Sequence, residues 1–309
     1  MNSSYIKIEP KFYLTSTQIR KDIIDMLYKA ESGHPGGSLS WVEIGNYLFL
    51  DGGMKVFADD PEKRDRFVLS KGHGVPTLYS ILKHLNIIEP GKLDTLRKAD
   101  MESPRGESNN LQGHPSIKTP GIEVSTGSLG TGIGIAVGKA DALKTRYGSK
   151  DERKVFVVTG DGEHQTEELW AAVRDAGKNK LNNLIVYVDH NGLQIDGCVE
   201  DISSIYPLRE KYKANNWHVV GTEVRFRERK KDYQPEGHDY NWLIDSWTRA
   251  QTQEEKPTVI IANTVKGAGI PFMENQVGWH GKAPGKKEYK EAIEHLKKLE
   301  KECISLIGV

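Results

Sequence analysis

The chain has few cysteines, no net charge and no long apolar run, and each absence excludes a class of protein. Its 309 residues contain two cysteines, Cys198 and Cys303, too few for a disulfide scaffold or a four-cysteine zinc site. Basic and acidic residues number 43 each, so the chain lacks the basic surplus that binds nucleic acid. No stretch approaches the roughly 20 apolar residues of a membrane span, and no apolar signal core opens the chain. We therefore expect a soluble, cytoplasmic protein with neither nucleic acid nor a membrane as its partner.

Short β-branched runs alternate with helical segments along much of the chain. These runs predict four strands, at 122–126, 155–158, 184–188 and 259–262. The intervening segments predict helices, which include 136–143 and 168–176. Such alternation predicts an α/β fold, a doubly wound, mostly parallel sheet with helices on both faces.

The N-terminal region is predicted to be an arm followed by two helices. Residues 1–12 form the arm, and a helix starts near Thr15, with Gln18 completing a possible capping box. Ser40 and Glu43 repeat this signal before a second helix. The glycine- and proline-rich segment between the two helices is predicted to break them.

The C-terminal end is predicted to be an amphipathic helix over residues 286–306. No linker interrupts the chain, so we expect residues 1–309 to form one domain.

Two polar residues follow successive predicted strands. Asp161 lies in Gly160-Asp161-Gly162, and Asn191 follows the next strand. A right-handed crossover brings such strand ends together at the edge where open α/β sheets bind ligands. A carboxylate and an amide oxygen beside a helix N-terminus are suited to Mg²⁺ and a phosphate group. These residues therefore predict a magnesium–diphosphate site, although Asp and Asn also occur in ordinary turns.

The segment from Ser125 to Gly134 is rich in glycine but lacks a nucleotide fingerprint. No register supplies G-x-G-x-x-G, and Gly138-Lys139 is not followed by Ser or Thr. The loop can bring backbone close to a ligand, and a nicotinamide-dependent dehydrogenase is disfavoured.

Four of the ten histidines lie in short loops that also contain glycine. They are His34, His73, His114 and His280. They lack the helical i, i+4 spacing of a zinc protease. A histidine in a loop is often only structural, but four of them suit a ligand that needs hydrogen-bond donors and proton transfer, such as a sugar or a phosphate.

Taken together, these motifs resemble the N-terminal, thiamine diphosphate-binding part of transketolase. The resemblance rests on Gly160-Asp-Gly162 with Asn191 thirty residues after Asp161, and on the ordered histidine set. Further matching segments lie at 32–36, 66–73, 113–115, 125–130, 266–269 and 278–284. The resemblance covers roughly residues 10–295 and implies the thiamine diphosphate-binding fold in its diphosphate-type domain.

The resemblance also implies a role for each matching position. Asp161, the Asn191 side chain and the Leu193 carbonyl would hold Mg²⁺, for which Ca²⁺ or Mn²⁺ can substitute. The diphosphate would be bound by Gly162, His73 and His280. The backbone of Gly127, Ser128 and Leu129 would seat the rest of thiamine diphosphate. The sugar would contact His34, His114 and His280.

The implied reaction is that of a transketolase-type transferase. A two-carbon ketol unit passes from a ketose or ketose phosphate to an aldose or aldose phosphate, and the cofactor supplies the reactive carbon. Full-size family members carry further domains, one of which holds the aminopyrimidine with a glutamate. We therefore expect a second subunit that carries the pyrimidine-binding and C-terminal domains, in a heterotetramer of two plus two chains.

The sequence departs from the family pattern at two places. The glutamates usual five and ten residues after the motif aspartate are replaced by Thr166 and Ala171, which puts the coupling of the two active sites in doubt. A basic insertion, Arg225 to Lys231, carries five positive charges and one negative charge. It is either a solvated loop or a docking surface for an acidic partner.

Two other functions stay open at this point. The enzyme could transfer the ketol unit to a non-sugar acceptor such as a carrier protein. Alternatively, the chain could be a non-catalytic subunit that binds the cofactor and regulates a partner.

Overall fold

The computed structural model describes residues 10–56, 61–99, 109–148 and 151–308. The contacts divide the chain into two compact units. The sheet unit comprises the described residues of Gly52–Gly72 and Thr126–Thr264, and the helical unit comprises those of Met1–Asp51, His73–Ser125 and Val265–Val309. That residues 1–309 form one domain stays a prediction.

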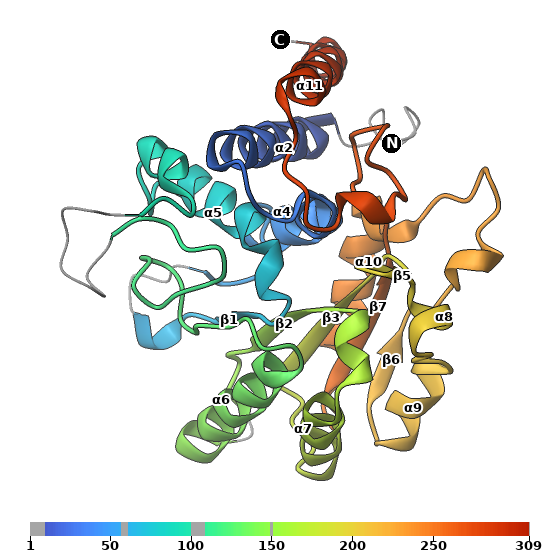
Figure 1. Ribbon diagram of the computed structural model, residues 1–309. Coiled ribbons are helices and arrows are strands. Elements are labelled where there is room, and N and C mark those ends of the chain that lie inside the picture. The colour runs from blue at the N-terminus through green and yellow to red at the C-terminus, as the bar shows by residue number, and fades with distance from the viewer. Residues whose placement is uncertain (1–9, 57–60, 100–108, 149–150, 309) are drawn as a thin grey trace. The chain divides into compact units, whose positions relative to one another are not determined.

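The sheet unit is built on five parallel strands in the order β1-β2-β3-β7-β6. They are β1 (Arg66–Leu69), β2 (Val155–Gly160), β3 (Leu184–His190), β6 (His218–Val220) and β7 (Thr258–Asn263). Every residue of β2, β3 and β7 is buried, which is why these strands are continuous apolar runs in the sequence. The predicted parallel sheet is confirmed (Figure 1).

Helices of the sheet unit connect the strands. The longer ones are α6 (Thr131–Tyr147), α7 (Glu167–Lys178), α9 (Leu208–Ala214) and α10 (Tyr240–Gln251). The chain moves one way across the sheet from β2 through α7 to β3, and the opposite way from β6 through α10 to β7. Right-handed crossovers therefore put α7 and α10 on opposite faces, as a doubly wound sheet requires.

Short elements cluster near the carboxyl ends of β2 and β3. They are the turn η4 (Gly162–Gln165), the hairpin of β4 (Leu193–Gln194) with β5 (Gly197–Cys198), and helix α8 (Val199–Ile202). Two single turns follow later, η5 (Phe226–Glu228) and η6 (Glu236–His238), and η1 (Pro61–Lys63) precedes β1.

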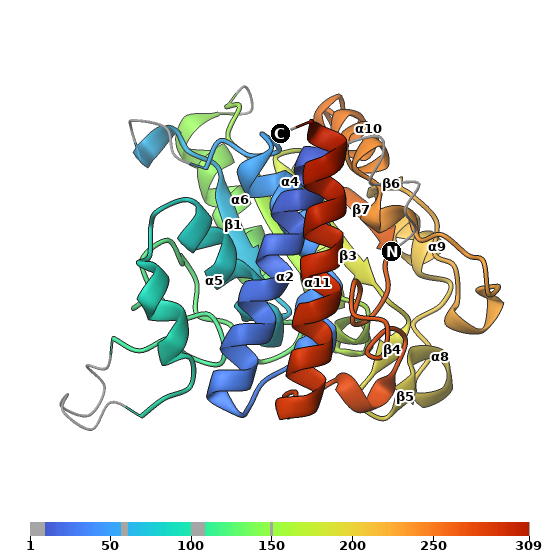
Figure 2. The same ribbon diagram turned by 90° about the horizontal axis from the view of Figure 1, so that it is seen from above.

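Among its described residues, the helical unit contains five α-helices and further short 3-10 helices. The helices are α2 (Pro10–Ala30), α3 (Pro35–Leu39), α4 (Val42–Leu50), α5 (Val75–His84) and α11 (Lys286–Ile307). The turns η3 (Pro90–Thr95) and η7 (Val277–Trp279) lie in the same unit, and η2 (Gly72–Gly74) precedes α5. Figure 2 shows α11 lying along α2. No helix among the described residues combines the length and hydrophobicity needed to span a membrane.

Several predicted boundaries were wrong. Helix α2 begins at Pro10 rather than near Thr15, so residues 10–12 are helical, and residues 1–9 of the predicted arm lie outside the described residues. Thr15 sits inside the helix and donates to the Lys11 carbonyl, so it caps nothing. The predicted strand 122–126 is irregular, although Ile122 and Val124 are buried.

The second predicted capping box was also wrong. Trp41 is the N-cap of α4 and no side chain caps this end. Glu43 instead forms a buried ion pair with Arg20 of α2, with N–O distances of 2.6 and 2.9 Å. A carboxylate needed for a long-range pair is not available to cap its own helix.

Candidate functional site

Asp161 and Asn191 stand at the carboxyl ends of neighbouring strands in the sheet unit. Asp161 directly follows β2, and Asn191 directly follows β3. The last pair in the register of these two strands is Gly160 with Asp189. The parallel pairing predicted from the sequence therefore brings the two polar residues to one edge of the sheet.

Hydrogen bonds tie the two loops together. One Asp161 oxygen, Oδ2, accepts a hydrogen bond from the Gly192 N–H at 2.5 Å, and Oδ1 accepts one from the Gly162 N–H at 2.8 Å. Asn191 Oδ1 accepts from the Leu193 N–H at 3.1 Å. The three residues predicted to hold a metal, Asp161, Asn191 and Leu193, are thus part of one hydrogen-bonded cluster, the metal loop cluster.

A buried glutamate that sequence reasoning missed joins this cluster to the glycine-rich loop. Glu163 accepts hydrogen bonds from Ser70 Oγ at 2.7 Å, from the Gly130 N–H at 3.0 Å and from the Gly160 N–H at 2.8 Å. Burial raises the pKa of this carboxyl. Its two oxygens link the loops before α6 and after β2.

The predicted cofactor backbone lies beside that glutamate. Ser128 and Leu129 are exposed, and the Ser128 carbonyl accepts from Thr131 Oγ1 at 2.7 Å. Gly127, Ser128 and Leu129 therefore form a surface turn that directly precedes α6. The helix predicted to follow Gly162 is only the turn η4, and α7 begins at Glu167.

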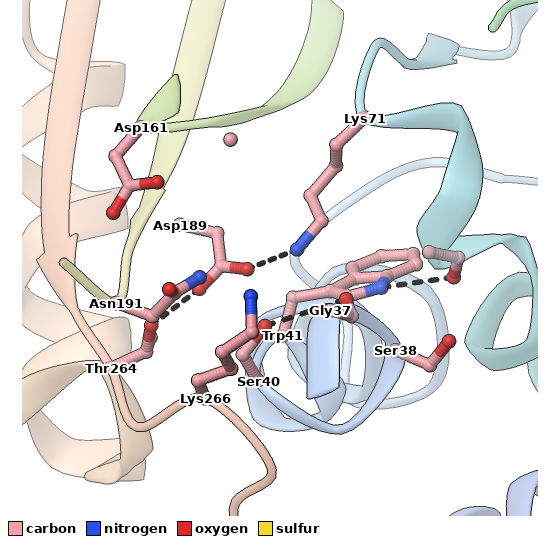
Figure 3. A network of polar contacts seen from close by, with 12 residues as sticks. Gly37, Ser38, Ser40, Trp41, Lys71, Asp161, Asp189, Asn191, Thr264 and Lys266 are labelled. Atoms are coloured by element: carbon pink, nitrogen blue, oxygen red, sulfur yellow. Dashed lines mark hydrogen bonds and ion pairs between the residues drawn. The ribbon is translucent and has the colours of Figure 1, made fainter. Parts of the chain in front are cut away.

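A buried ion pair anchors the end of β3. Lys71 pairs with Asp189, whose second oxygen accepts from Thr264 Oγ1 (Figure 3). The side chains of Lys71 and Asp189 are 1% and 0% exposed. Because Asp189 lies two residues before Asn191, this pair fixes the strand end from which the metal loop cluster starts.

Two further histidines, His164 and His190, border the metal loop cluster and were not predicted. His164 faces the carbonyls of Gly160 and Asp161 through Nδ1, and Tyr212 OH through Nε2 at 2.9 Å. Since carbonyls only accept, Nδ1 carries the proton and Nε2 accepts from the tyrosine. Burial lowers the pKa of His164 to about 4, so this ring is a neutral structural link.

His190 is held in the same way. Its Nδ1 contacts Asn263 Oδ1 at 2.8 Å, and its Nε2 contacts Tyr206 OH at 2.8 Å. Burial lowers the pKa of His190 to about 4. No sequence pattern marks either histidine, because their side-chain partners are 16 to 73 residues away along the chain.

The helical unit gathers the four histidines that the sequence singled out. The ring centroid of His34 lies 5.4 Å from that of His73, 6.3 Å from that of His114 and 5.6 Å from that of His280. The rings of His73 and His280 are 5.2 Å apart. Residues from distant parts of the chain thus form one histidine cluster.

Positive charge surrounds this histidine cluster. Lys266 Nζ lies 2.8 Å from His280 Nδ1. Burial, followed by the charge of Arg97, lowers the pKa of His34 to about 4, and the same two causes lower that of His114. These two rings are therefore neutral at pH 7, while the cations beside them favour an anionic or electron-rich ligand.

The residues present fit the implied cofactor in each unit. The metal loop cluster offers a carboxylate, an amide and a main-chain carbonyl, the hard oxygen donors that Mg²⁺ takes. Among the described side chains, no three His, Cys, Asp or Glu gather as a metal site. Within the described residues, no hydrogen-bond donor or acceptor reaches the buried His34 Nδ1, as expected of a group meant for a ligand.

The roles of these positions stay predictions. Asp161, Gly162, Asn191 and Leu193 are brought together with each other, and so are the four histidines. The predicted diphosphate ligands come from both units, Gly162 from the sheet unit and His73 and His280 from the helical unit.

The basic insertion is largely exposed, as one interpretation expected, but three of its basic side chains also contact the sheet unit. Arg227 pairs with Asp201 at 2.6 Å, and Arg225 lies over the Tyr206 ring at 4.9 Å. Arg229 donates to main-chain carbonyls that include Asn191 O. Three of its five basic side chains therefore make contacts within the sheet unit, two of them at its surface.

Comparison with known proteins identifies the family. Residues 14–300 match the thiamine diphosphate binding domain of transketolase. An apulose-4-phosphate transketolase subunit of Phocaeicola vulgatus is 36% identical over 296 residues, which cover 94% of this chain and 96% of that protein. The 6-deoxy-6-sulfo-D-fructose transketolase subunit SqwG of a Clostridium species is 33% identical, with 91% and 94% covered.

Solved structures agree with this assignment. Transketolase from Campylobacter jejuni superposes with a TM-score of 0.76 at 26% identity, over 100% of this chain and 47% of that chain. Transketolase from Leishmania mexicana gives a TM-score of 0.73, over 96% of this chain and 46% of that chain. This chain spans about half the length of these solved transketolases. With the fold, the strand-end residues and the matched length in agreement, the chain belongs to the transketolase family as a thiamine diphosphate-binding domain.

Proposed function

We propose that this chain is the cofactor-binding subunit of a two-subunit transketolase that requires thiamine diphosphate and Mg²⁺. It moves a two-carbon ketol unit from a ketose or ketose phosphate to an aldose or aldose phosphate. A second subunit supplies the pyrimidine-binding and C-terminal domains, and two copies of each form the active heterotetramer.

The observation that carries this proposal is the combination of coverage and site. Relatives named as transketolase subunits match this chain over 96% and 94% of their own length, whereas solved transketolase chains are about twice as long. At the same time the metal loop cluster gathers the positions proposed for the metal, and the histidine cluster gathers those proposed for the sugar. A chain that had only a structural role would have no need of both.

In this proposal the metal loop cluster holds Mg²⁺ through Asp161, Asn191 and the Leu193 carbonyl. The diphosphate is bound by Gly162, His73 and His280, and the backbone of residues 127–129 seats the thiamine portion. Lys266 Nζ lies 2.8 Å from His280 Nδ1. A charged lysine only donates, so Nδ1 would accept and Nε2 of His280 would carry the ring proton.

The sugar is contacted by His34, His114 and His280. Thiamine diphosphate supplies the carbon nucleophile that cleaves and reforms the bond next to a ketose carbonyl. Since His34 and His114 are neutral at pH 7, each can donate or accept a hydrogen bond with a sugar hydroxyl, and His114 can also move a proton. The low pKa of His34 makes it a poor base and favours a hydrogen-bonding role.

The donor and acceptor fall within the sugar and sugar phosphate class. The named relatives act on apulose 4-phosphate and 6-deoxy-6-sulfo-D-fructose, so the general transketolase reaction is one of several that the family offers. Transfer to a carrier protein stays the alternative, since four of the five basic side chains of the insertion are exposed and only Arg229 turns inward.

The experiment is a cofactor titration of the purified two-subunit complex with the Asp161→Ala variant. We predict at least a roughly 100-fold loss of Mg²⁺-dependent thiamine diphosphate affinity, because the carboxylate carries the metal's charge balance. Isothermal calorimetry measures it. Asp175→Ala removes an exposed carboxylate from α7 and serves as the matched control with unchanged affinity. Wild-type affinity in Asp161→Ala would refute the metal assignment.

A further inference from the structure

The basic insertion contributes one side chain that reaches three separate carbonyls at the carboxyl ends of the strands. Arg229 Nη1 donates to Asn191 O at 3.1 Å and to Thr264 O at 2.7 Å, and Nη2 donates to His190 O at 2.8 Å. Nε donates to Val224 O at 3.2 Å. The guanidinium therefore bridges the end of β3 and the end of β7.

Nearly all of the guanidinium's hydrogen-bonding capacity is used in this way. Arginine has five N–H donors, and four are directed to these carbonyls. The fifth faces His190 Nδ1 at 3.4 Å, a ring nitrogen that itself carries a proton toward Asn263. Little capacity is left for an external anion, so Arg229 acts on the protein and does not serve as a phosphate-binding residue.

Other residues of the insertion contact the loop that follows β3. Phe226 packs against Gly192, where a Cβ atom would lie 2.8 Å from the Phe226 Cβ. Gly192 also has φ +80°, a conformation that favours glycine. The main-chain N–H of Arg227 donates to Glu200 Oε1 at 3.0 Å, and its guanidinium pairs with Asp201. The insertion is thus a strap over the segment that runs from the metal loop cluster into α8.

We infer that Arg229 is a positioning residue that holds the Asn191–Leu193 loop in the conformation that binds Mg²⁺ and the diphosphate. This inference rests on the proposed function. Asn191 has to present its side chain, and Leu193 its carbonyl, while the chain turns sharply at Gly192. Clamping the main-chain carbonyls of His190 and Asn191 fixes this turn before the metal arrives, as outer hydrogen bonds do for many metal ligands.

The test compares Arg229→Gln and Arg229→Lys with Lys231→Gln, an exposed cation of the same insertion. Hydrogen exchange of the full chain reports on the Gly192 and Leu193 amides. We expect exchange there to rise about tenfold or more in both Arg229 variants, with the β2 and β3 amides unchanged. Lysine does not rescue, because one ammonium cannot replace the planar fork across three carbonyls.

A second readout addresses the metal directly. In the two-subunit complex, the Mg²⁺ concentration for half-maximal thiamine diphosphate binding should rise about 10- to 100-fold in Arg229→Gln. Thiamine diphosphate affinity at saturating Mg²⁺ should stay near wild type, which a merely damaged fold would not allow. Lys231→Gln should leave both readouts unchanged.

Two results would overturn the inference. One is wild-type exchange at Gly192 and Leu193, and the other is an unchanged Mg²⁺ requirement in Arg229→Gln. If Arg229→Gln does not fold, Arg229→Lys decides by the same two criteria. If the wild-type complex binds no thiamine diphosphate, the proposed function fails; if it binds and the variants match it, only the role of Arg229 fails.

Discussion

Burial and one arginine lower the pKa values of two histidines of the histidine cluster. His34 and His114 both have lowered pKa values, for which burial is the first cause and Arg97 the second. Arg97 is held by a hydrogen bond to Ser32 Oγ at 3.1 Å. A fixed positive charge near two imidazoles disfavours a second proton on either of them.

Replacing Arg97 with Gln should therefore raise the pKa of both His34 and His114. Neither value should reach the ordinary histidine pKa of about 6.5, because burial, the larger cause, remains. The acid limb of any His34-dependent activity would shift to higher pH, since the ring takes up its proton sooner as pH falls. An NMR titration of the histidine ring protons measures this.

Lys118→Gln, which removes an exposed cation four residues after His114, provides the comparison and should change neither pKa. Unaltered titration of His34 and His114 in Arg97→Gln would show that Arg97 does not control the cluster.

Candidate site residues that belong to a sequence motif could be predicted, and those outside any motif were missed. Asp161, Asn191 and the four histidines stand in short patterns whose spacing reflects strand ends and loops. Glu163 and Arg229 have no such pattern, because their roles depend on contacts with Gly130 or with Asn191 and Thr264 that only the folded chain creates.

The helical elements depend on a buried ion pair between α2 and α4. Arg20 and Glu43 are both 0% exposed, and Arg20 Nε also donates to Ala268 O at 2.8 Å. A buried ion pair adds little stability compared with apolar side chains packed in the same place. Removing one partner, however, leaves the other charge buried and unpaired.

Arg20→Met should destabilise the chain by about 3–5 kcal/mol, since it leaves the Glu43 carboxylate unpaired. The double variant Arg20→Met with Glu43→Leu should recover much of this loss. Urea unfolding followed by circular dichroism gives the comparison. Lys21→Met breaks only the partly exposed pair with Glu300, 2.9 Å apart, and should cost less than about 1 kcal/mol.

A loss in Arg20→Met no larger than in Lys21→Met would contradict this account of the helical unit. So would a double variant less stable than Arg20→Met, because the cost would then lie in packing rather than in an unpaired charge.

The predictability of the elements follows their length and burial. The strands β2, β3 and β7 and the helices α6, α7 and α11 were predicted because long apolar runs or periodic patterns mark them. Strands β1 and β6 have four and three residues, too few to show a period. The segment 122–126 has strand-like alternation because it buries Ile122 and Val124 as an irregular chain.

For the whole molecule, the chain is about half of a solved transketolase in length, and it matches relatives named as transketolase subunits over nearly their entire length. The family and the parallel sheet could be predicted from the ordered motifs. The substrate could not, because relatives matched over nearly their whole length are named for different sugars.

The central claim is that the chain works only with a partner that completes the thiamine diphosphate site. Native mass spectrometry of the tagged chain, purified from its own host with thiamine diphosphate and Mg²⁺ present, tests this most directly. The account predicts two copies of this chain, two copies of a pyrimidine-binding partner and bound cofactor in one complex. A chain that is recovered alone, or in a complex that carries no thiamine diphosphate, would contradict it.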